Sequence, residues 1–255
     1  MARKLSTRKR PSREEYTLRE QLKIEEGVFD NRTMMMLGKL FTRNVITSVN
    51  HIVKRGKEAD VYLADPGSKT AGAEQVIIKI FRVETSSFSS RINYIHGDPR
   101  FKGIGSSRGQ IISTWCKKEY GNLKIAEEAK VHSPRPYSFI GNVLAMEFIG
   151  EDTVPANTLK ESGTEDPQKT LGTLIGDMRK LYQSELVHGD ISEYNILMKG
   201  SMPYIIDFGQ AVTLGHPKAV EMLSRDVTNL CSFFAKRYKI EADQAELLKK
   251  ITGAD

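Results

Sequence analysis

The sequence predicts an α+β fold of two lobes, in which a β-rich first half leads into a helical second half. Short apolar runs bounded by turn residues dominate the chain up to residue 150, and longer amphipathic stretches follow. The 255 residues and 39% hydrophobic content suffice for a packed core, and no internal repeat is visible. We therefore expect a basic tail over residues 1–29, a first lobe over 30–150 and a second lobe over 151–255.

The positive charge of the chain is concentrated at its start. Residues 1–20 contain seven Lys and Arg against three Glu, a net of +4 out of the formal +6 of the whole chain. Such a tail can hold nucleic-acid phosphates by releasing counterions, and it can equally be a solvated terminus without a partner. The charge pattern leaves both interpretations open.

The remaining composition excludes several classes of protein. Cys116 and Cys231 are the only cysteines and form no CxxC pair, which argues against a disulfide framework or a zinc site and fits a reducing cytoplasm. No apolar run approaches the roughly 18 residues of a membrane span, and no signal-peptide pattern opens the chain. We expect a cytoplasmic protein without membrane association.

The first lobe is expected to begin with a helix and continue with strands. Apolar residues at positions 36, 37, 40 and 41 have helical spacing, so a helix is predicted over 34–46 with Asp30 or Asn31 as its cap. Short apolar runs predict strands around 51–53, 61–64 and 76–83, and the segment PGSKTAG supplies the turn between the last two.

Residues 85–109 interrupt this pattern. They are rich in Ser, Gly and Arg and have no clear period, which predicts a long mobile loop. Loops of this length inside a domain are usually functional or disordered. Ser106 or Ser107 in this loop is a candidate site of autophosphorylation.

The rest of the chain shows mainly helical spacing. Asp166 as a cap and Pro167 in the first turn begin an apolar stripe, which predicts a helix over 166–186 that packs against a core. Further helices are predicted over 110–130, over 217–237 starting at Pro217, and over 241–252. Strands are predicted over 137–140 and 143–149, joined by a Gly141-Asn142 hairpin turn, and over 195–198 and 204–207.

The segment VHGDISEYNILM, followed by YIIDFGQA, carries the chemistry. Phosphoryl transfer needs a carboxylate that orients the nucleophile or accepts its proton, and oxygen ligands for Mg²⁺ at the nucleotide phosphates. Asp190 and Asn195 share one loop and can face the same small volume, while Asp207 at the end of a strand is placed as a second metal ligand. Several independent elements must fall in this order, which makes the pattern a strong indication.

A lysine in the strand VIIK completes the phosphate-binding groups. A cation at Lys79 would neutralise nucleotide phosphates, and a buried carboxylate on the following helix would hold it. Glu119 is the partner that we favour because it lies one turn from Trp115 and Leu123 on a half-buried face. Glu127 and Glu128 are weaker candidates.

Two further segments are predicted to contact the nucleotide. KRGKEADV precedes the lysine strand and keeps one glycine of the usual three, so Gly56 and Lys57 are expected in a loop that covers the phosphates. VLAMEFIG is expected as the last strand of the first lobe. Backbone groups of Glu147 and Ile149 would then bond an adenine edge and Met146 would line its pocket. His188 is interpreted as a structural group beneath the catalytic loop.

Together these residues resemble the RIO family of atypical protein kinases, and within it the founding subfamily of archaea and eukaryotes. The similarity spans residues 30–238. The segments that carry it are GKEADVY, IIKIFR, the 85–109 loop, TWCKKEYGNL, LAMEFIG, HGDISEYNIL and IIDFGQAV. Asp60 stands where the family usually has an asparagine. Residues 1–50 are too short for the winged-helix domain of the sister branch.

The resemblance implies a truncated, bilobal protein-kinase-like fold and a serine/threonine kinase that uses ATP with Mg²⁺ or Mn²⁺. It implies Asp190 as catalytic base, Asn195 and Asp207 as metal ligands, and Lys79 as an ATP contact. It also implies that Asp207 accepts phosphate transiently, so that the protein acts largely as an ATPase switch. The implied partner is the maturing small ribosomal subunit with its rRNA.

Three alternatives have their own signatures. Small-molecule kinases also use HGD-x4-N, but they tend to carry a His after the Asp and an acidic residue at the position of Gly209. The small archaeal kinase of the tRNA-modifying complex lacks an insertion like 85–109. A scaffold that binds ATP and pre-ribosomal RNA without catalysis would not need Lys79, Asp190, Asn195 and Asp207 together. The substrate, the RNA site and the oligomeric state are not predicted.

Overall fold

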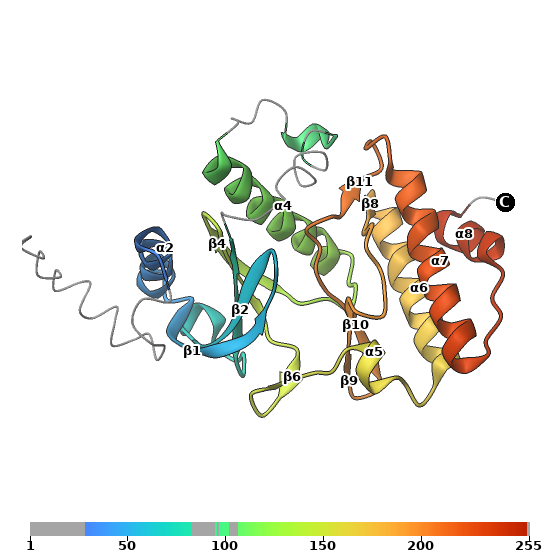
Figure 1. The fold of residues 1–255 in the computed structure, drawn as a ribbon, viewed down its shortest axis with the longest axis horizontal. Helices are drawn as coiled ribbons and strands as arrows, with labels where there is room; N and C mark the ends of the chain where they lie inside the picture. The colour runs from blue at the N-terminus through green and yellow to red at the C-terminus, as the bar shows by residue number, and fades with distance from the viewer. Residues whose placement is uncertain (1–28, 83–94, 96, 102–106, 254–255) are drawn as a thin grey trace, which may run out of the picture.

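The computed structural model describes residues 29–82, 95, 97–101 and 107–253. In this part of the chain, five strands form an antiparallel sheet in the order β1-β2-β3-β5-β4 (Figure 1). The strands are β1 (Ile46–Arg55), β2 (Ala59–Pro66), β3 (Val76–Phe81), β4 (Pro136–Ile140) and β5 (Val143–Glu147). All six residues of the central strand β3 are buried, which explains its nearly continuous apolar run.

The alternation of side chains along β3 decides what each face of the sheet does. Ile78 and Ile80 pack in a cluster with Leu37 and Leu40 of helix α2 (Asn31–Thr42). Phe81 belongs instead to the cluster that contains helix α4 (Arg108–Glu128). Because successive side chains of a strand point to opposite faces, Lys79 points to the same face as Phe81, toward α4.

The second half of the chain is mainly helical. Helices α6 (Pro167–Gln183), α7 (Ala219–Tyr238) and α8 (Gln244–Thr252) pack side by side at the far end of the molecule from β1 (Figure 1). Short strand pairs and turns lie between them and the large sheet. These are β6 (Gly150–Glu151) with β7 (Val154–Pro155), α5 (Leu159–Ser162), β8 (Leu186–Val187) with β11 (Val212–Thr213), and β9 (Ile196–Lys199) with β10 (Met202–Ile205). In the first half of the chain, the 3₁₀ turn Ser68–Thr70 connects β2 to β3, and the 3₁₀ turn Pro99–Phe101 precedes α4.

Several predicted boundaries are wrong by two to four residues. The helix predicted over 34–46 is α2, which Asp30 caps and which ends at Thr42, because Asn44 adopts a left-handed backbone (φ 54°) and sends Ile46 into the sheet. The strand predicted over 204–207 ends at Ile205, so Asp207 lies beyond it. The strand predicted over 143–149 ends at Glu147. The helix predicted from Pro217 begins at Ala219 after Lys218.

Two predictions concern residues that are largely outside the described part of the chain. Of the basic tail predicted over 1–29, residues 1–28 are outside the described part, and so are residues 85–94, 96 and 102–106 of the 85–109 loop. The described end of that loop differs from the prediction, because Ser107 caps α4 and the helix starts at Arg108. Every helix that the structure describes is too short or too polar to cross a bilayer.

Candidate active site

The loop between β8 and β9 brings Asp190 and Asn195 together. The side-chain amide of Asn195 donates from Nδ2 to the backbone oxygen of Asp190 (2.9 Å) and to its Oδ2 (3.0 Å). Gln210 donates to the same Oδ2 (3.1 Å). The Asn195 backbone N–H donates to the backbone carbonyl of Ser192 (3.0 Å) and so closes the loop. The D-x4-N spacing therefore produces one compact loop, as predicted.

The surroundings of Asp190 suit a proton acceptor. Burial, together with the negative charge of Asp207, raises the pKa of the Asp190 carboxyl to about 6. The hydrogen bond from Asn195 and the charge of Arg225 oppose this rise. A carboxyl with a pKa close to neutrality can take a proton and still be mostly ionised at pH 7.

Asp207 lies in the turn after β10, where its backbone is left-handed (φ 66°). Aspartate tolerates this conformation better than most residues with a Cβ. Its Oδ1 accepts a hydrogen bond from Lys79 Nζ (2.9 Å), and its side chain is 49% exposed. The positive charge of Lys79 lowers the pKa of Asp207, so the carboxylate is ionised.

Lys79 joins two carboxylates that are distant in the sequence. Its Nζ donates to both oxygens of Glu119 (2.7 and 2.9 Å) and to Asp207. Burial disfavours the charge on Lys79, but Asp207 and Glu119 outweigh burial and raise its pKa above the ordinary value. The predicted Lys79–Glu119 pair is thereby confirmed.

The two weaker candidates for this pairing are wrong. Glu127 lies two turns farther along α4 and pairs with Lys124 (2.7 Å) and Arg135 (3.1 Å). Glu128 is the last residue of the helix. The period of the helix therefore directs Glu119, and not these two, to the sheet face that presents Lys79.

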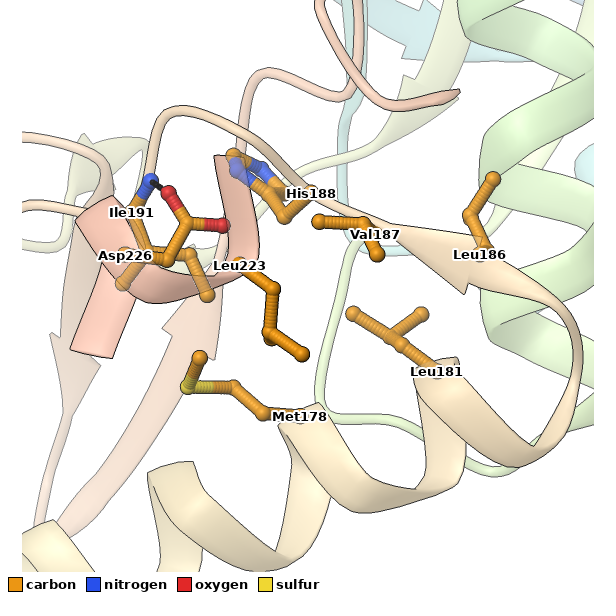
Figure 2. A pocket seen from close by; sticks show the side chains of 8 residues that line it. All are labelled: Met178, Leu181, Leu186, Val187, His188, Ile191, Leu223 and Asp226. Carbon is orange, nitrogen blue, oxygen red and sulfur yellow. Dashed lines mark hydrogen bonds between the residues drawn. The ribbon is translucent and has the colours of Figure 1, made fainter. Parts of the chain in front are cut away.

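Asp226 supports the catalytic loop from below, and sequence reasoning missed it. This fully buried residue of α7 accepts hydrogen bonds from the backbone N–H groups of Gly189 (2.7 Å) and Ile191 (2.9 Å). Figure 2 shows its carboxylate directed at Ile191 above the apolar side chains of Met178 and Leu223. The space among these residues is too small to hold a water molecule. The only signal in the sequence is a charged residue on the apolar stripe of a helix.

His188 has the structural role predicted for it. It is buried, and burial lowers its pKa to about 4, so the ring is neutral. Its Nε2 lies 3.1 Å from the backbone oxygen of Ile206, and its Nδ1 accepts from the Asp190 N–H (3.3 Å). The ring also packs edge-on against Phe208 (4.7 Å between centroids). His188 thus connects the Asp190 loop with the Asp207 turn.

The hairpin between β1 and β2 holds the predicted phosphate-covering loop. The Gly56 N–H donates to Ala59 O (3.0 Å), and a Cβ at position 56 would lie 2.8 Å from that oxygen, so the turn needs glycine. Lys57 is exposed at the tip. The negative charge of the neighbouring Glu58 contributes to the raised pKa of Asp190. Asp60 pairs with Arg82 (2.6 Å).

The predicted adenine-binding segment follows β5. The Glu147 N–H donates to Arg135 O (2.8 Å), and the Ile149 carbonyl accepts from the Ala156 N–H (3.0 Å). The Glu147 carbonyl and the Ile149 N–H are the other backbone groups of these two residues, and they are the candidates for a base edge. Met146 is half-buried and packs against two hydrophobic clusters of the core.

The oxygen donors of the site fit a magnesium ion that shares its ligands with a nucleotide. The described residues contain no group of three or more His, Cys, Asp or Glu that could hold a metal alone. Mg²⁺ in nucleotide sites usually takes one or two protein carboxylates and completes its shell with phosphates and water. The Nδ2 group of Asn195 donates to Asp190, so its Oδ1 is the side-chain atom that could bind a cation. The half-exposed carboxylate of Asp207 is the second candidate ligand.

Comparison with known proteins gives consistent matches. Residues 60–247 match the family model of the RIO domain. The chain is 41% identical over 237 residues to the RIO-type serine/threonine-protein kinase Rio1 of Methanocaldococcus jannaschii, covering 92% of this chain and 79% of that protein. It is 38% identical over 234 residues to Rio1 of Haloferax volcanii, with the same coverage. The human serine/threonine-protein kinase RIO1 is 37% identical over 89% of this chain and 40% of its own length.

Solved structures agree on the fold. The Rio2 kinase from Chaetomium thermophilum, solved as an ADP/Mg²⁺-phosphoaspartate complex, matches with a TM-score of 0.65 and 23% identity over 91% of this chain and 71% of that chain. A second Rio2 structure from the same organism gives a TM-score of 0.65 and 22% identity over 89% of this chain and 72% of that one. The predicted truncated, kinase-like α+β fold is confirmed.

Proposed function

The chain belongs to the RIO family of serine/threonine-protein kinases, and we propose that it transfers the γ-phosphate of Mg-ATP to protein acceptors, itself included, during maturation of the small ribosomal subunit. The observation that carries this proposal is the position of Lys79 between Glu119 and Asp207. This arrangement holds a cation beside a half-exposed carboxylate, close to the Asp190 loop, as a nucleotide phosphate site requires.

Each part of the nucleotide has a candidate contact. The Glu147 carbonyl and the Ile149 N–H would bond the adenine edge beside Met146. Gly56 and Lys57 would cover the phosphates from the hairpin tip. When ATP enters, we expect Lys79 to exchange its bond to Asp207 for the phosphates and to keep its bonds to Glu119. Asn195 and Asp207 would hold Mg²⁺, or Mn²⁺ in its place.

The transfer step uses the two carboxylates differently. Asp190, with its raised pKa, would accept the proton of an acceptor hydroxyl while that oxygen attacks the γ-phosphorus. The bond between the γ-phosphorus and the bridging oxygen breaks, and ADP leaves. A bound magnesium ion would supply charge neutralisation at the phosphates. Gln210 and Asn195, which donate to Asp190, would keep its carboxylate oriented.

We also propose that Asp207 itself accepts phosphate. Its exposed carboxylate oxygen would attack the γ-phosphorus, ADP would leave, and water would later hydrolyse the acyl phosphate to aspartate and inorganic phosphate. Two observations support this. The carboxylate is half exposed and held ionised by Lys79, and the Rio2 kinase with a similar fold is described as a phosphoaspartate complex. The net reaction is ATP hydrolysis, which suits a binding cycle.

The proposed partner is the pre-small-subunit particle with its rRNA, which would place the protein in the cytoplasm. The support is the family and the net charge of +4 in residues 1–20, which suits phosphate backbones.

The proposal is tested with ATP labelled at the γ-phosphate. The wild-type chain should release or transfer label only when Mg²⁺ or Mn²⁺ is present, and Lys79→Met should abolish this. Lys69→Met, the same change at an exposed position, should keep wild-type activity. Circular dichroism checks that Lys79→Met is folded. Label release that is equal in both variants would refute the proposed site.

A further inference from the structure

One face of α4 directs polar side chains at the turn that follows Asp207. Trp115, Lys118, Glu119 and Asn122 succeed one another at steps of three, one and three, so they share a face of the helix. All four are buried, and Lys118 and Asn122 are 0% exposed. Glu119 holds Lys79, as described above. The role of the two polar neighbours of Glu119 is not explained by nucleotide binding.

Lys118 and Asn122 hold three backbone carbonyls. Lys118 Nζ donates to Gly209 O (2.9 Å) and to Ala211 O (2.5 Å). Asn122 Nδ2 donates to Phe208 O (2.8 Å) and to Ala211 O (2.9 Å). The backbone immediately after Asp207 is therefore tied to α4 through residues 208, 209 and 211.

Fixing this backbone with a buried lysine is energetically costly. Burial lowers the pKa of Lys118 to about 7, although the negative charges of Asp98 and Glu119 oppose this shift. The Nζ group itself bonds neutral carbonyl oxygens. A residue buried against Trp115 could be apolar at a lower desolvation cost. Instead, two buried polar side chains of α4 form hydrogen bonds to the backbone of a short turn. Buried polar networks of this kind are expected where a turn must stay in one conformation.

Gly209 lets the turn approach the helix closely. A Cβ at position 209 would lie 3.0 Å from the indole nitrogen of Trp115, so the backbone rests almost directly on the ring. Asp207, two residues earlier, has the left-handed φ of 66°. A backbone held at 208, 209 and 211 leaves little freedom for Asp207 to relax out of this conformation.

A second layer orients the amide of Asn122. Arg100 Nη2 donates to Asn122 Oδ1 (2.9 Å), so the Nδ2 group must face the carbonyls. Arg100 is itself held by the buried Asp98, with bonds of 3.0 and 2.7 Å. The described segment 97–101 thereby reaches the Asp207 turn through one asparagine.

We propose that Lys118 and Asn122 are positioning residues for Asp207, and that they keep its carboxylate in the orientation that binds the metal. The inference rests on the proposed function, because it assumes that Asp207 is a magnesium ligand. Without the two side chains, the turn would sample other conformations. The apparent metal affinity would then fall in proportion to the fraction of molecules whose Asp207 is in place.

The test compares Lys118→Met with Lys117→Met, the same change at the exposed neighbour on the same helix. The dissociation constant of a non-hydrolysable ATP analogue is measured in EDTA and in Mg²⁺. In EDTA, the three proteins should bind alike, because Lys118 does not contact the nucleotide. In Mg²⁺, wild type and Lys117→Met should bind the analogue more tightly than in EDTA. Lys118→Met should lose about tenfold of this gain in affinity, which corresponds to about one molecule in ten with Asp207 in the metal-binding orientation. Saturating Mg²⁺ should restore its ATP turnover.

Asn122→Leu is the second variant, since it keeps the side-chain volume and introduces no charge into the core. It should show the same loss of the Mg²⁺ effect, and it replaces Lys118→Met if that protein does not fold. An unchanged Mg²⁺ effect in a folded variant would overturn the positioning role while leaving the proposed function intact. If wild type itself showed no Mg²⁺ effect on binding, Asp207 would not be a metal ligand, and both proposals would fail.

Discussion

Asp190 and Asp207 are two carboxylates of one site whose surroundings shift their pKa values in opposite directions. Burial and the neighbouring negative charge raise the pKa of Asp190, whereas Lys79 lowers that of Asp207. Divergent pKa values are the usual sign that two acids have separate roles. Asp190 is suited to accept a proton, and Asp207 is suited to remain an anion beside a cation.

The first prediction is that ATP turnover is lost at low pH because Asp190 becomes protonated. With a pKa of about 6, this carboxyl is protonated at lower pH and cannot act as a base. The raised pKa means that activity is lost as pH falls through about 6 and is retained above it. We expect kcat/KM for ATP to rise with pH and level off by about pH 7. Steady-state turnover in a constant-ionic-strength buffer series measures this.

Asparagine variants provide the control for that profile. Asp190→Asn should lose about 10²–10⁴-fold in turnover while its nucleotide affinity stays close to wild type. Asp60→Asn makes the same chemical change in the β1–β2 hairpin, where the carboxylate pairs with a partly exposed Arg82, and it should keep the wild-type profile. A profile without any loss of activity toward pH 5 would contradict the role of Asp190.

The sequence identifies residues of this site when a motif carries them. Asp190, Asn195 and Asp207 lie in two short motifs, and Lys79 with Glu119 follows from a strand and the period of a helix. Asp226, Lys118 and Asn122 could not be found this way. They bond backbone groups 35 to 93 positions away, and such a partner leaves no pattern in the sequence near either residue.

At the scale of elements, the strongly periodic segments are predicted well. Helix α6 begins after Asp166 with Pro167 in its first turn, as expected from the cap. The two-residue strands β6, β7, β8 and β11 are not predicted, since two residues cannot show a period. Helix α2 ends shortly before Asn44 and strand β10 ends shortly before Asp207, and both residues have left-handed backbone conformations, which are uncommon for residues other than glycine.

The second prediction concerns the anchor that α7 provides. Asp226→Ala would leave the N–H groups of Gly189 and Ile191 buried without acceptors, at about 1–3 kcal/mol each. Urea unfolding should show that the free energy of unfolding of Asp226→Ala is lower than that of wild type by this order of magnitude, and its ATP turnover should be reduced. Glu221→Ala removes an exposed carboxylate from the same helix and should cost less than about 1 kcal/mol. Equal stabilities of the two variants would refute the anchor.

The third prediction concerns the start of α4. Ser107 is exposed and caps this helix, where a phosphate would lie at the positive end of the helix dipole. We expect autophosphorylation at Ser107, or at Ser106, which lies outside the described residues. Mass spectrometry after incubation with Mg-ATP locates the sites, and a double alanine variant is the control. Phosphoserine or phosphothreonine found only elsewhere would reject this assignment.

At the scale of the whole molecule, the site lies where the large sheet and the helical half meet. Lys79 comes from β3, Glu119 from α4 and Asp207 from the turn after β10. The order of motifs along the sequence predicts this fold class, because each motif belongs to one half. The sequence cannot predict how closely the halves approach, since the contact depends on packing among residues far apart in the chain.

The fourth prediction is that added peptides are poor substrates. Protein kinases that phosphorylate peptides hold them on a long segment between DFG and an A-P-E motif. Here α7 starts at Ala219, soon after Asp207, and the sequence contains no A-P-E. Peptide-library phosphorylation should be slower than the roughly 1–100 per second of ordinary kinases, and small-subunit particles should stimulate ATP turnover. Fast peptide phosphorylation without such stimulation would contradict the proposed cycle.

The most direct test of phosphoryl transfer through Asp207 is a single-turnover experiment with γ-labelled ATP. Enzyme in excess is mixed with Mg-ATP, with and without small-subunit particles, and quenched in acid. We predict label on the protein that hydroxylamine removes and that Asp207→Asn does not acquire. Asparagine tolerates the left-handed backbone at this position, so the variant should fold. Protein label that resists hydroxylamine, or that persists in Asp207→Asn, would contradict the account.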